Sequence, residues 1–314
     1  MIICLILNKE NIMNIEKVIN SISYKKDKFK KIIEKVNNAN VKSIQTLPSL
    51  RGSALPFCGI KYMIDYLKVK NKVDIEDIVD FNTLFYLSFG TYTHEFIQQL
   101  LGINGKMYGK WICENDKCKD IHEGKYTSCS KCGSQKKYIE YNIYYKGFSG
   151  HIDGIVKIKN KYYVIEFKTT SKQNQKKLTQ PYYNHLLQAS SYAYVLAKNE
   201  KKNEPKMLVD GIIICYINRE DIIKRKFETT TFMYKFKDLN PLFDLFETQL
   251  DMFWKTKKMI SKNKDKRIPL DFKKIRLCNN YIEYGCNFKY GCEYSTICFN
   301  ETILKDYIDK LKDF

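Results

Sequence analysis

The sequence predicts an α/β fold in which helices flank a mixed β-sheet. Two segments rich in β-branched and aromatic residues, 152–158 (IDGIVKI) and 162–168 (YYVIEFK), are joined by a short polar connection and predict a β-hairpin. Segments 82–101 and 182–197 have the apolar spacing of amphipathic helices, the first closed by Gly102 and the second following a proline. Together these elements indicate a mixed sheet that carries the hairpin between helices.

The hairpin also carries charged residues where a strand is otherwise apolar. Side chains alternate along a strand, so Glu166 and Lys168 share one face, roughly 7 Å apart along the strand. Asp153 lies near the start of the other strand. Acids and a lysine at such positions are costly to bury unless they hold something, such as a metal ion and its water. We therefore expect the chemistry of this protein on the hairpin.

Length and charge restrict the class of protein. The chain has 314 residues and a net charge of +19, which favours a polyanionic partner over a Lys- and Asn-rich codon bias alone. The longest apolar run, residues 1–7, is too short to span a membrane and has no basic segment before it. These features predict a protein of the cytoplasm, or of the host-cell interior if a phage or virus encodes it, without a membrane partner.

Four cysteines in a polar, lysine-rich stretch predict a zinc ribbon over residues 111–136. They form two close pairs, and two pairs on tight turns can present four thiolates to one tetrahedral ion. The alternative is four unpaired surface thiols. His122 could replace one ligand, although we interpret it as a solvated loop histidine. The predicted ligands are Cys113, Cys118, Cys129 and Cys132.

A second group of cysteines lies near the end of the chain. A lone Cys58 stands far upstream, and Cys4 and Cys215 lie in apolar runs typical of core cysteines. Four C-terminal thiolates could bind a second zinc; three of them with Cys58 could hold an iron–sulfur cluster. Spacing alone does not decide between the two. The C-terminal cysteines are Cys278, Cys286, Cys292 and Cys298.

Four motifs appear in the order that a known family shows. They are Gly90-Thr-Tyr-Thr-His94-Glu95, Gly150-x-x-Asp153, Glu166-x-Lys168 and Gln188-x-x-x-Tyr192. Over residues 47–300 the chain resembles the RecB-like branch of the PD-(D/E)XK nucleases, particularly the CRISPR-associated and phage-encoded exonucleases that carry a four-iron cluster. Taken alone, His94 is typical of an interior histidine, and Gln188 and Tyr192 of a helix surface.

The resemblance implies a role for each motif residue. The metal ligands would be His94, Asp153, Glu166 and the main-chain carbonyl of Phe167, and this oxygen and nitrogen set suits Mn²⁺ or Mg²⁺. Lys168 would orient or deprotonate the attacking water, which makes Asp153, Glu166 and Lys168 the catalytic set. Two further residues, Gln188 and Tyr192, would line the nucleic-acid path. We interpret Glu95 and Glu140 as structural.

Two departures from the family pattern affect the metal sites. The family's C-terminal cysteines usually run Cys-x2-Cys-x5-Cys, whereas here the spacing is five residues twice. We expect the [4Fe–4S] ligands to be Cys58, Cys286, Cys292 and Cys298, with Cys278 spare and a second zinc as the alternative. The other departure is the inserted ribbon, which we interpret as an appendage that faces DNA or a partner.

These expectations combine into one interpretation. Residues 1–45 form a basic helical lead-in, residues 46–314 a PD-(D/E)XK nuclease domain with the ribbon at 111–136, and residues 278–300 the cysteine segment. The expected activity is a metal-dependent DNA exonuclease acting on single strands or ends in recombination, repair or replication. A structure-specific or restriction-type endonuclease and a non-catalytic nucleic-acid-binding module are the alternatives.

Two lysine-rich segments, 24–35 and 255–267, could follow a phosphate backbone, although charge runs are usually solvated faces. Residues 105–111 lack the spacing of a phosphate-binding Walker A loop. Any helicase activity would therefore come from a helicase or recombination partner.

Overall fold

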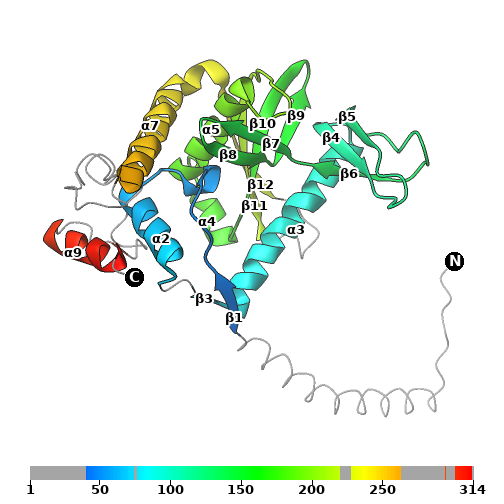
Figure 1. Cartoon of the computed structure of the whole chain (residues 1–314). Coiled ribbons are helices and arrows are strands. Elements are labelled where there is room, and N and C mark those ends of the chain that lie inside the picture. Colours follow the sequence, from blue (N-terminus) through cyan, green and yellow to red (C-terminus); the bar gives the residue numbers. More distant parts are fainter. Residues whose placement is uncertain (1–39, 74–75, 220–227, 263–293, 295–300, 313–314) are drawn as a thin grey trace, which may run out of the picture. The chain divides into compact units, whose positions relative to one another are not determined.

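The computed structural model describes residues 40–73, 76–219, 228–262, 294 and 301–312 (Figure 1). These residues fall into two compact units. The first contains β1 (Asn40–Ile44), β3 (Glu76–Asp80) and the start of α3 (Phe81–Ile103) as far as Phe89. The second contains the other described elements, including α3 from Gly90 onward.

The first unit corrects the predicted lead-in. β1 pairs with β3 in an antiparallel two-stranded sheet, so residues 40–44 are a strand where the sequence predicted a helix. Residues 40–44 read Asn-Val-Lys-Ser-Ile, and strand pairing rather than the lysine content decides their conformation. The rest of the lead-in, residues 1–39, lies outside the described part of the chain.

A seven-stranded mixed sheet forms the centre of the second unit, as the sequence predicted. Its order is β12-β11-β10-β9-β4-β5, and β6 also pairs with β4. β10 and β11 are parallel, and every other neighbouring pair is antiparallel. The strands are β4 (Met107–Cys113), β5 (Ile121–Lys125), β6 (Lys136–Ile139), β9 (Gly154–Ile158), β10 (Lys161–Thr170), β11 (Gly211–Asn218) and β12 (Thr229–Lys235).

A three-stranded sheet lies next to the large one along the chain. It contains β2 (Leu50–Arg51), β7 (Tyr141–Tyr145) and β8 (Phe148–Ile152), in the order β2-β8-β7. The chain enters it from β6 and leaves it into β9. Glu140 is the residue between β6 and β7, and Asp153 is the residue between β8 and β9. Both acids therefore stand where the chain crosses from one sheet to the other.

Helices cover both faces of the large sheet. Alternation along β10 sends Val164 into a core with α5 (Tyr183–Lys198) and α7 (Asn240–Lys262), and sends Ile165 and Phe167 into a second core with Ile97 of α3. This arrangement confirms the predicted α/β class. The shorter elements are η1 (Gly52–Ala54), α4 (Lys172–Lys176) and η2 (Phe236–Leu239).

The last described helix, α9 (Glu301–Lys312), packs beside α2 (Gly59–Asn71) in a small separate core (Figure 1). Tyr294 belongs to this core, and its hydroxyl donates a hydrogen bond of 2.8 Å to Asp65 of α2. Cys58 directly precedes α2 and packs against the same core. The helix pair therefore brings the segment after Cys58 and a residue of the C-terminal cysteine segment together.

Gly102 has a different role from the one predicted. The helix that it was expected to close continues through it to Ile103. A side chain at Gly102 would collide with the ring of Trp111 on β4. The glycine therefore allows α3 to approach the strand that begins the cysteine-rich region.

Several predictions fall on residues outside the described part of the chain. They concern Cys4, Cys278, Cys286, Cys292 and Cys298, and the basic segment 24–35. Of segment 255–267, the part up to Lys262 belongs to α7, where Lys255 pairs with Asp251 at 2.6 Å. No helix among the described residues is both long and apolar enough to span a bilayer.

Candidate active site

Asp153 takes its position from the end of the β9–β10 hairpin. The hairpin forms as predicted, with Ile165 paired to Gly154 as its last register position. Beyond that pair β9 no longer accompanies β10, because the chain at Asp153 comes from the other sheet. The main-chain N–H of Phe167 donates instead to Asp153 Oδ2 at 2.8 Å. The Asp153 carboxylate thus accepts the hydrogen bond that a main-chain carbonyl of a neighbouring strand would otherwise accept.

Glu166 and Lys168 share a face of β10, as alternation predicted. Lys168 Nζ lies 2.7 Å from Glu166 Oε1 and donates to Gln188 Oε1 at 3.0 Å. The Gln188 amide donates in turn to the Tyr192 hydroxyl at 3.1 Å. Two partners therefore hold the ammonium group in place at the end of the strand.

Gln188 and Tyr192 lie next to Lys168 and are not among the residues that line the described pocket. Both side chains are buried, at 8% and 5% exposure, and their place on a nucleic-acid path stays a prediction. Their hydrogen bonds support Lys168 from inside α5. The motif glycine Gly150 belongs to this arrangement, because a Cβ there would stand 2.6 Å from the Tyr192 ring.

His94 faces Asp153 from α3. Its Nδ1 lies 3.6 Å from Asp153 Oδ2, and burial lowers the pKa of the imidazole, so the ring is neutral near pH 7. Gln98 stands one helical turn further along the same face. Its amide donates to the main-chain oxygen of Asp153 at 2.8 Å and to Glu140 Oε1 at 3.0 Å. The amide thus ties the helix of His94 to both sheet-crossing acids.

Glu140 and Gln98 are two residues near Asp153 whose positions the sequence did not reveal. Glu140 was interpreted as structural, and Gln98 was not singled out. The spacing of four residues between His94 and Gln98 is a usable signal for Gln98. No local pattern marks Glu140, because its approach to Asp153 depends on the two sheet crossings.

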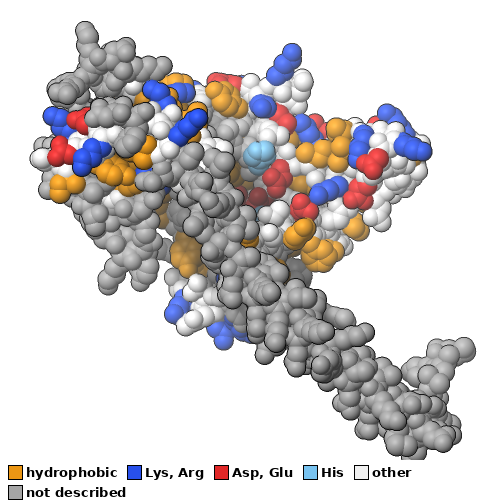
Figure 2. All heavy atoms as spheres, turned by 60° about the horizontal axis from the view of Figure 1, so that its bottom comes forward, with side chains coloured by type: hydrophobic (Ala, Val, Ile, Leu, Met, Phe, Trp, Pro, Cys, Tyr) orange, Lys and Arg blue, Asp and Glu red, His pale blue; other side chains and the backbone are white. Residues whose placement is uncertain are grey.

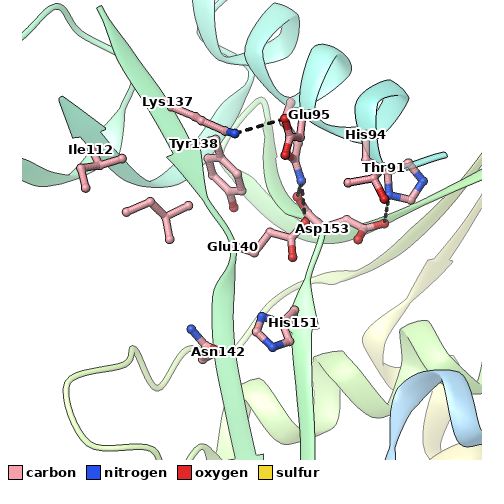
Figure 3. A pocket seen from close by; sticks show the side chains of 12 residues that line it. Thr91, His94, Glu95, Ile112, Lys137, Tyr138, Glu140, Asn142, His151 and Asp153 are labelled. Atoms are coloured by element: carbon pink, nitrogen blue, oxygen red, sulfur yellow. Dashed lines mark hydrogen bonds and ion pairs between the residues drawn. The ribbon is translucent and has the colours of Figure 1, made fainter. Parts of the chain in front are cut away.

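A pocket of about 670 Å³ opens beside these residues. Figure 2 shows acidic and histidine side chains gathered in a hollow on this face of the molecule, and Figure 3 shows the lining side chains from close by. One wall comes from α3 and the other from strands β4, β6, β7 and β8. The lining residues are Thr91, His94, Glu95, Gln98, Ile112, Lys137, Tyr138, Ile139, Glu140, Asn142, His151 and Asp153.

The buried acids carry a large electrostatic cost when both are charged. Burial, and then the charge of Glu140, raises the pKa of Asp153 to about 7. Burial and the charge of Asp153 raise the pKa of Glu166 to about 8, although Lys168 and His94 oppose that shift. Without a further positive charge, the site therefore retains protons near neutral pH.

A divalent cation fits this donor set. Glu166 Oε2 is buried and has no hydrogen-bond partner among the described residues, which leaves an oxygen for another ligand. Its neighbours in the site are a carboxylate and a neutral imidazole, the ligands that Mn²⁺ and Mg²⁺ accept. The ligand atoms of His94, Asp153 and Glu166 do not all lie within 4.8 Å of one another. Binding by all three side chains would therefore require them to move closer together.

The raised pKa values predict a pH-dependent stability in the presence of EDTA. Below about pH 4 the carboxyl groups of Asp153 and Glu166 are protonated in the folded and in the unfolded protein. Between about pH 4 and pH 8 the folded protein binds more protons than the unfolded protein, because both pKa values are raised in the folded state. The free energy of unfolding therefore falls as pH rises through this window. We expect Tm at pH 8.5 to lie below Tm at pH 6 by roughly 2–4 °C for each kcal/mol lost.

Asp153→Asn should reduce this pH dependence, because one of the titrating groups is gone. Asp210→Asn is the matched control, since Asp210 also accepts a β10 main-chain N–H, from Tyr162 at 2.9 Å, but is exposed. Thermal unfolding curves of the three proteins across this pH range would measure the effect. Identical curves for wild type and Asp153→Asn would contradict the buried-acid interpretation.

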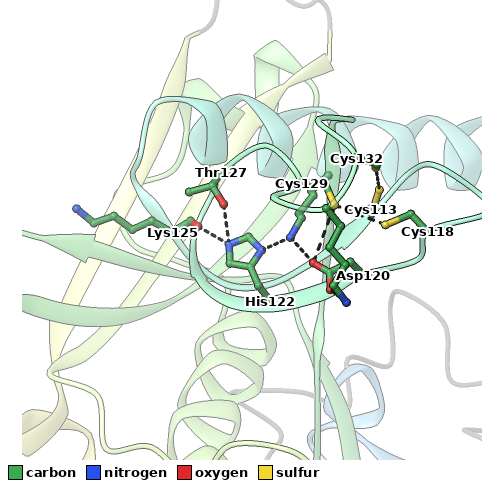
Figure 4. Close-up of polar contacts among 10 residues, drawn as sticks. Cys113, Cys118, Asp120, His122, Lys125, Thr127, Cys129 and Cys132 are labelled. Atoms are coloured by element: carbon green, nitrogen blue, oxygen red, sulfur yellow. Dashed lines mark hydrogen bonds and ion pairs between the residues drawn. The ribbon is translucent and has the colours of Figure 1, made fainter.

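The four cysteines of the predicted ribbon converge as expected (Figure 4). Among the described residues, they are the only set of three or more His, Cys, Asp and Glu whose ligand atoms all lie within 4.8 Å of one another. The sulfur atoms of Cys113 and Cys132 are 3.4 Å apart, and those of Cys118 and Cys129 are 3.7 Å apart. Four sulfurs about 2.3 Å from a tetrahedral zinc lie about 3.8 Å from one another, so the spacing suits that ion.

His122 lies on β5 rather than in a solvated loop, and it is not a member of this group. The buried Lys136 donates to His122 Nδ1 at 2.9 Å, so this nitrogen must be an acceptor. His122 Nε2–H then donates to the Lys125 carbonyl at 2.8 Å. Lys136 also lies 3.1 Å from Asp120, which pairs with Lys131 at 2.8 Å. Lys131 also interacts electrostatically with Cys118 and Cys129, so it places positive charge beside these thiols.

Comparison with known proteins identifies the family. The model of the PD-(D/E)XK nuclease superfamily matches residues 127–299, which is more than half of the chain. The protein therefore belongs to the PD-(D/E)XK nuclease superfamily. The match includes Asp153, Glu166 and Lys168, whereas His94 precedes it.

Other comparisons are weaker. A solved structure, "Crystal structure of SSO0001", is similar over 67% of this chain and 79% of its own, with 14% identity and a TM-score of 0.33. No curated protein matches the sequence. Membership of the superfamily defines the chain as a metal-dependent nuclease, a hydrolase that acts on nucleic acid.

Proposed function

We propose that this protein is a metal-dependent DNA exonuclease of the RecB-like branch, acting on single strands or DNA ends in recombination, repair or replication. The observation that carries the proposal is that Glu166 and Lys168 lie close to Asp153, which lines the pocket, and that the His94 imidazole is directed at Asp153. Phosphodiester hydrolysis requires an activated water and compensation of phosphate charge, and a bound Mn²⁺ or Mg²⁺ supplies both.

Each residue has a defined task in this proposal. His94, Asp153 and Glu166 hold the cation, and the Phe167 carbonyl is a further candidate ligand. As an ammonium, Lys168 orients the attacking water; it could accept the proton of that water only as a neutral amine, after first losing a proton of its own. The hydrogen bond from Lys168 to Gln188 fixes the ammonium group for this task. Gln98 positions the histidine helix against Asp153.

We further propose that the four converging cysteines bind zinc and that the site is structural. A tetrahedral ion with four thiolate ligands has no open position for substrate. Hydrogen bonds from Ser134 lower the pKa of the Cys132 thiol to about 6, so one ligand is already a thiolate at neutral pH. The ribbon strands β4 and β6 also form a wall of the active-site pocket, so the zinc would support the site indirectly.

The second proposed metal centre is a [4Fe–4S] cluster held by Cys58, Cys286, Cys292 and Cys298. Support comes from Tyr294, which lies between the last two of these cysteines in the sequence and contacts the helix that follows Cys58. Iron and zinc analysis of anaerobically purified protein tests this assignment. Two zinc ions and no iron per chain would replace the cluster with a second zinc site.

Cleavage of matched linear and circular single-stranded DNA with Mn²⁺ tests the activity. An exonuclease degrades the end-labelled linear strand and leaves the circle intact, because a circle has no end. Cutting of the circle would instead establish the alternative endonuclease. If the protein binds both DNA substrates and cleaves neither, it is a non-catalytic nucleic-acid-binding module.

A further inference from the structure

The active-site pocket extends past the catalytic residues along one pair of strands. Asn142 of β7 and His151 of β8 line it together with Asp153 (Figure 3). Neither residue belongs to the catalytic set. Among the described residues, neither side chain forms a hydrogen bond within the protein, whereas Gln98 and Glu140 of the same pocket are hydrogen-bonded to each other.

The pairing of β7 with β8 places these two side chains next to each other and close to Glu140 and Asp153. Asn142 and His151 are direct cross-strand partners, and they lie on the outer face of the small sheet. Alternation puts each of them two residues from a sheet-crossing acid, Glu140 on one strand and Asp153 on the other. The polar pair is therefore roughly 7 Å from those acids along the strands.

The part of the strand wall that β4 and β6 form has a different character. Ile112 of β4 and Ile139 of β6 present apolar surface there, beside the ring of Tyr138. Apolar surface combined with a few polar groups is typical of a site for an organic ligand with a flat apolar face and polar edges. A nucleoside has both. The pocket also falls within the usual size range of small-ligand sites, about 300–1,000 Å³.

The charged residues that line the pocket favour binding of a nucleoside of the DNA strand over binding of a second phosphate group. Glu95 and Glu140 both line the pocket, and Lys137, the only lysine among the described lining residues, is already paired with Glu95 at 3.1 Å. A phosphate group would therefore be repelled there. A neutral base or sugar can instead accept from and donate to the Asn142 amide and the His151 imidazole.

We propose that Asn142 and His151 form a nucleoside subsite, which binds the base or sugar next to the phosphodiester held at Asp153. This inference rests on the proposed nuclease function and deepens it. The subsite would determine where the strand lies relative to the catalytic centre, and the cysteine-containing β4–β6 region would form its apolar wall.

Steady-state cleavage of a short single-stranded DNA with Mn²⁺ tests the subsite. We expect His151→Ala and Asn142→Ala each to raise KM roughly fivefold, the effect of one lost hydrogen bond, with kcat and the Mn²⁺ activation constant unchanged within about twofold. Ser149→Ala is the matched control: Ser149 lies on the same face of β8, two cross-strand pairs further along, and outside the pocket lining. Both altered residues are partly or fully exposed, so the variants should fold normally.

Two further outcomes separate this inference from the proposed function. If KM is the same in His151→Ala, Asn142→Ala and Ser149→Ala, or if only kcat falls, the subsite is overturned while the nuclease remains. Fluorescence anisotropy of the labelled strand in EDTA measures binding without cleavage. If the wild-type protein cleaves no DNA but binds the labelled strand more tightly than His151→Ala does, the nuclease function is wrong and the subsite stands. If it cleaves no DNA and the two proteins bind the strand equally, both proposals are wrong.

Discussion

Asp153→Asn lowers the rate of Mn²⁺-dependent DNA cleavage by at least roughly 10³-fold, equivalent to about 4 kcal/mol of lost transition-state stabilisation. The substitution removes the carboxylate that lies between the His94 ring and the Phe167 amide. The asparagine oxygen can still accept the Phe167 N–H, so the sheet crossing should remain folded. Lys168→Ala should lower the rate by about 10²–10⁴-fold, because the ammonium that orients the water is lost.

Two variants on or beside β10 serve as controls. Asp210→Asn removes another carboxylate that accepts a main-chain N–H of β10, at the end of the strand away from the pocket. Lys161→Ala removes an exposed lysine at the first position of β10. Single-turnover assays with end-labelled DNA compare all four. Cleavage by Asp153→Asn at the rate of Asp210→Asn would remove the site assignment.

Cys129→Ser is expected to abolish zinc binding at the four-cysteine centre and to unfold the surrounding ribbon. Cys129 is buried at 3% exposure, and it is the only buried residue between positions 114 and 135. Zinc contributes on the order of 10–16 kcal/mol to folding in isolated zinc-finger peptides, so its loss greatly exceeds the effect of an ordinary point substitution. Cleavage should also fall, because Ile112 and Ile139 of the ribbon strands line the active-site pocket.

Cys215→Ala provides the matched control for the zinc centre. Cys215 is also buried, in the core beneath the large sheet, but it is not near the other thiols. This variant should lose stability through its cavity and keep its zinc. Metal analysis together with amide hydrogen exchange over residues 111–136 distinguishes the two effects. Full zinc content in Cys129→Ser would show that these thiols are not ligands of one ion.

Local patterns in the sequence were sufficient for several parts of the site. Alternation along residues 162–168 correctly placed Glu166 and Lys168 on one face, and helical spacing correctly placed Gln188 beside Tyr192. The convergence of the four ribbon cysteines also followed from their spacing. Each of these relations joins residues that one strand, one helix or one pair of turns brings together.

The sequence by itself therefore determined the α/β class, the hairpin, the helices and the cysteine group, since periodicity and short spacing encode them. Only the tertiary structure decided that Glu140 stands at the second sheet crossing, that Gln98 joins it to Asp153, and that Asn142 faces the same pocket. Tertiary structure also buried Gln188 and Tyr192 beneath Lys168. These placements depend on pairing between strands far apart in the chain, and no short-range pattern of residues records such pairing.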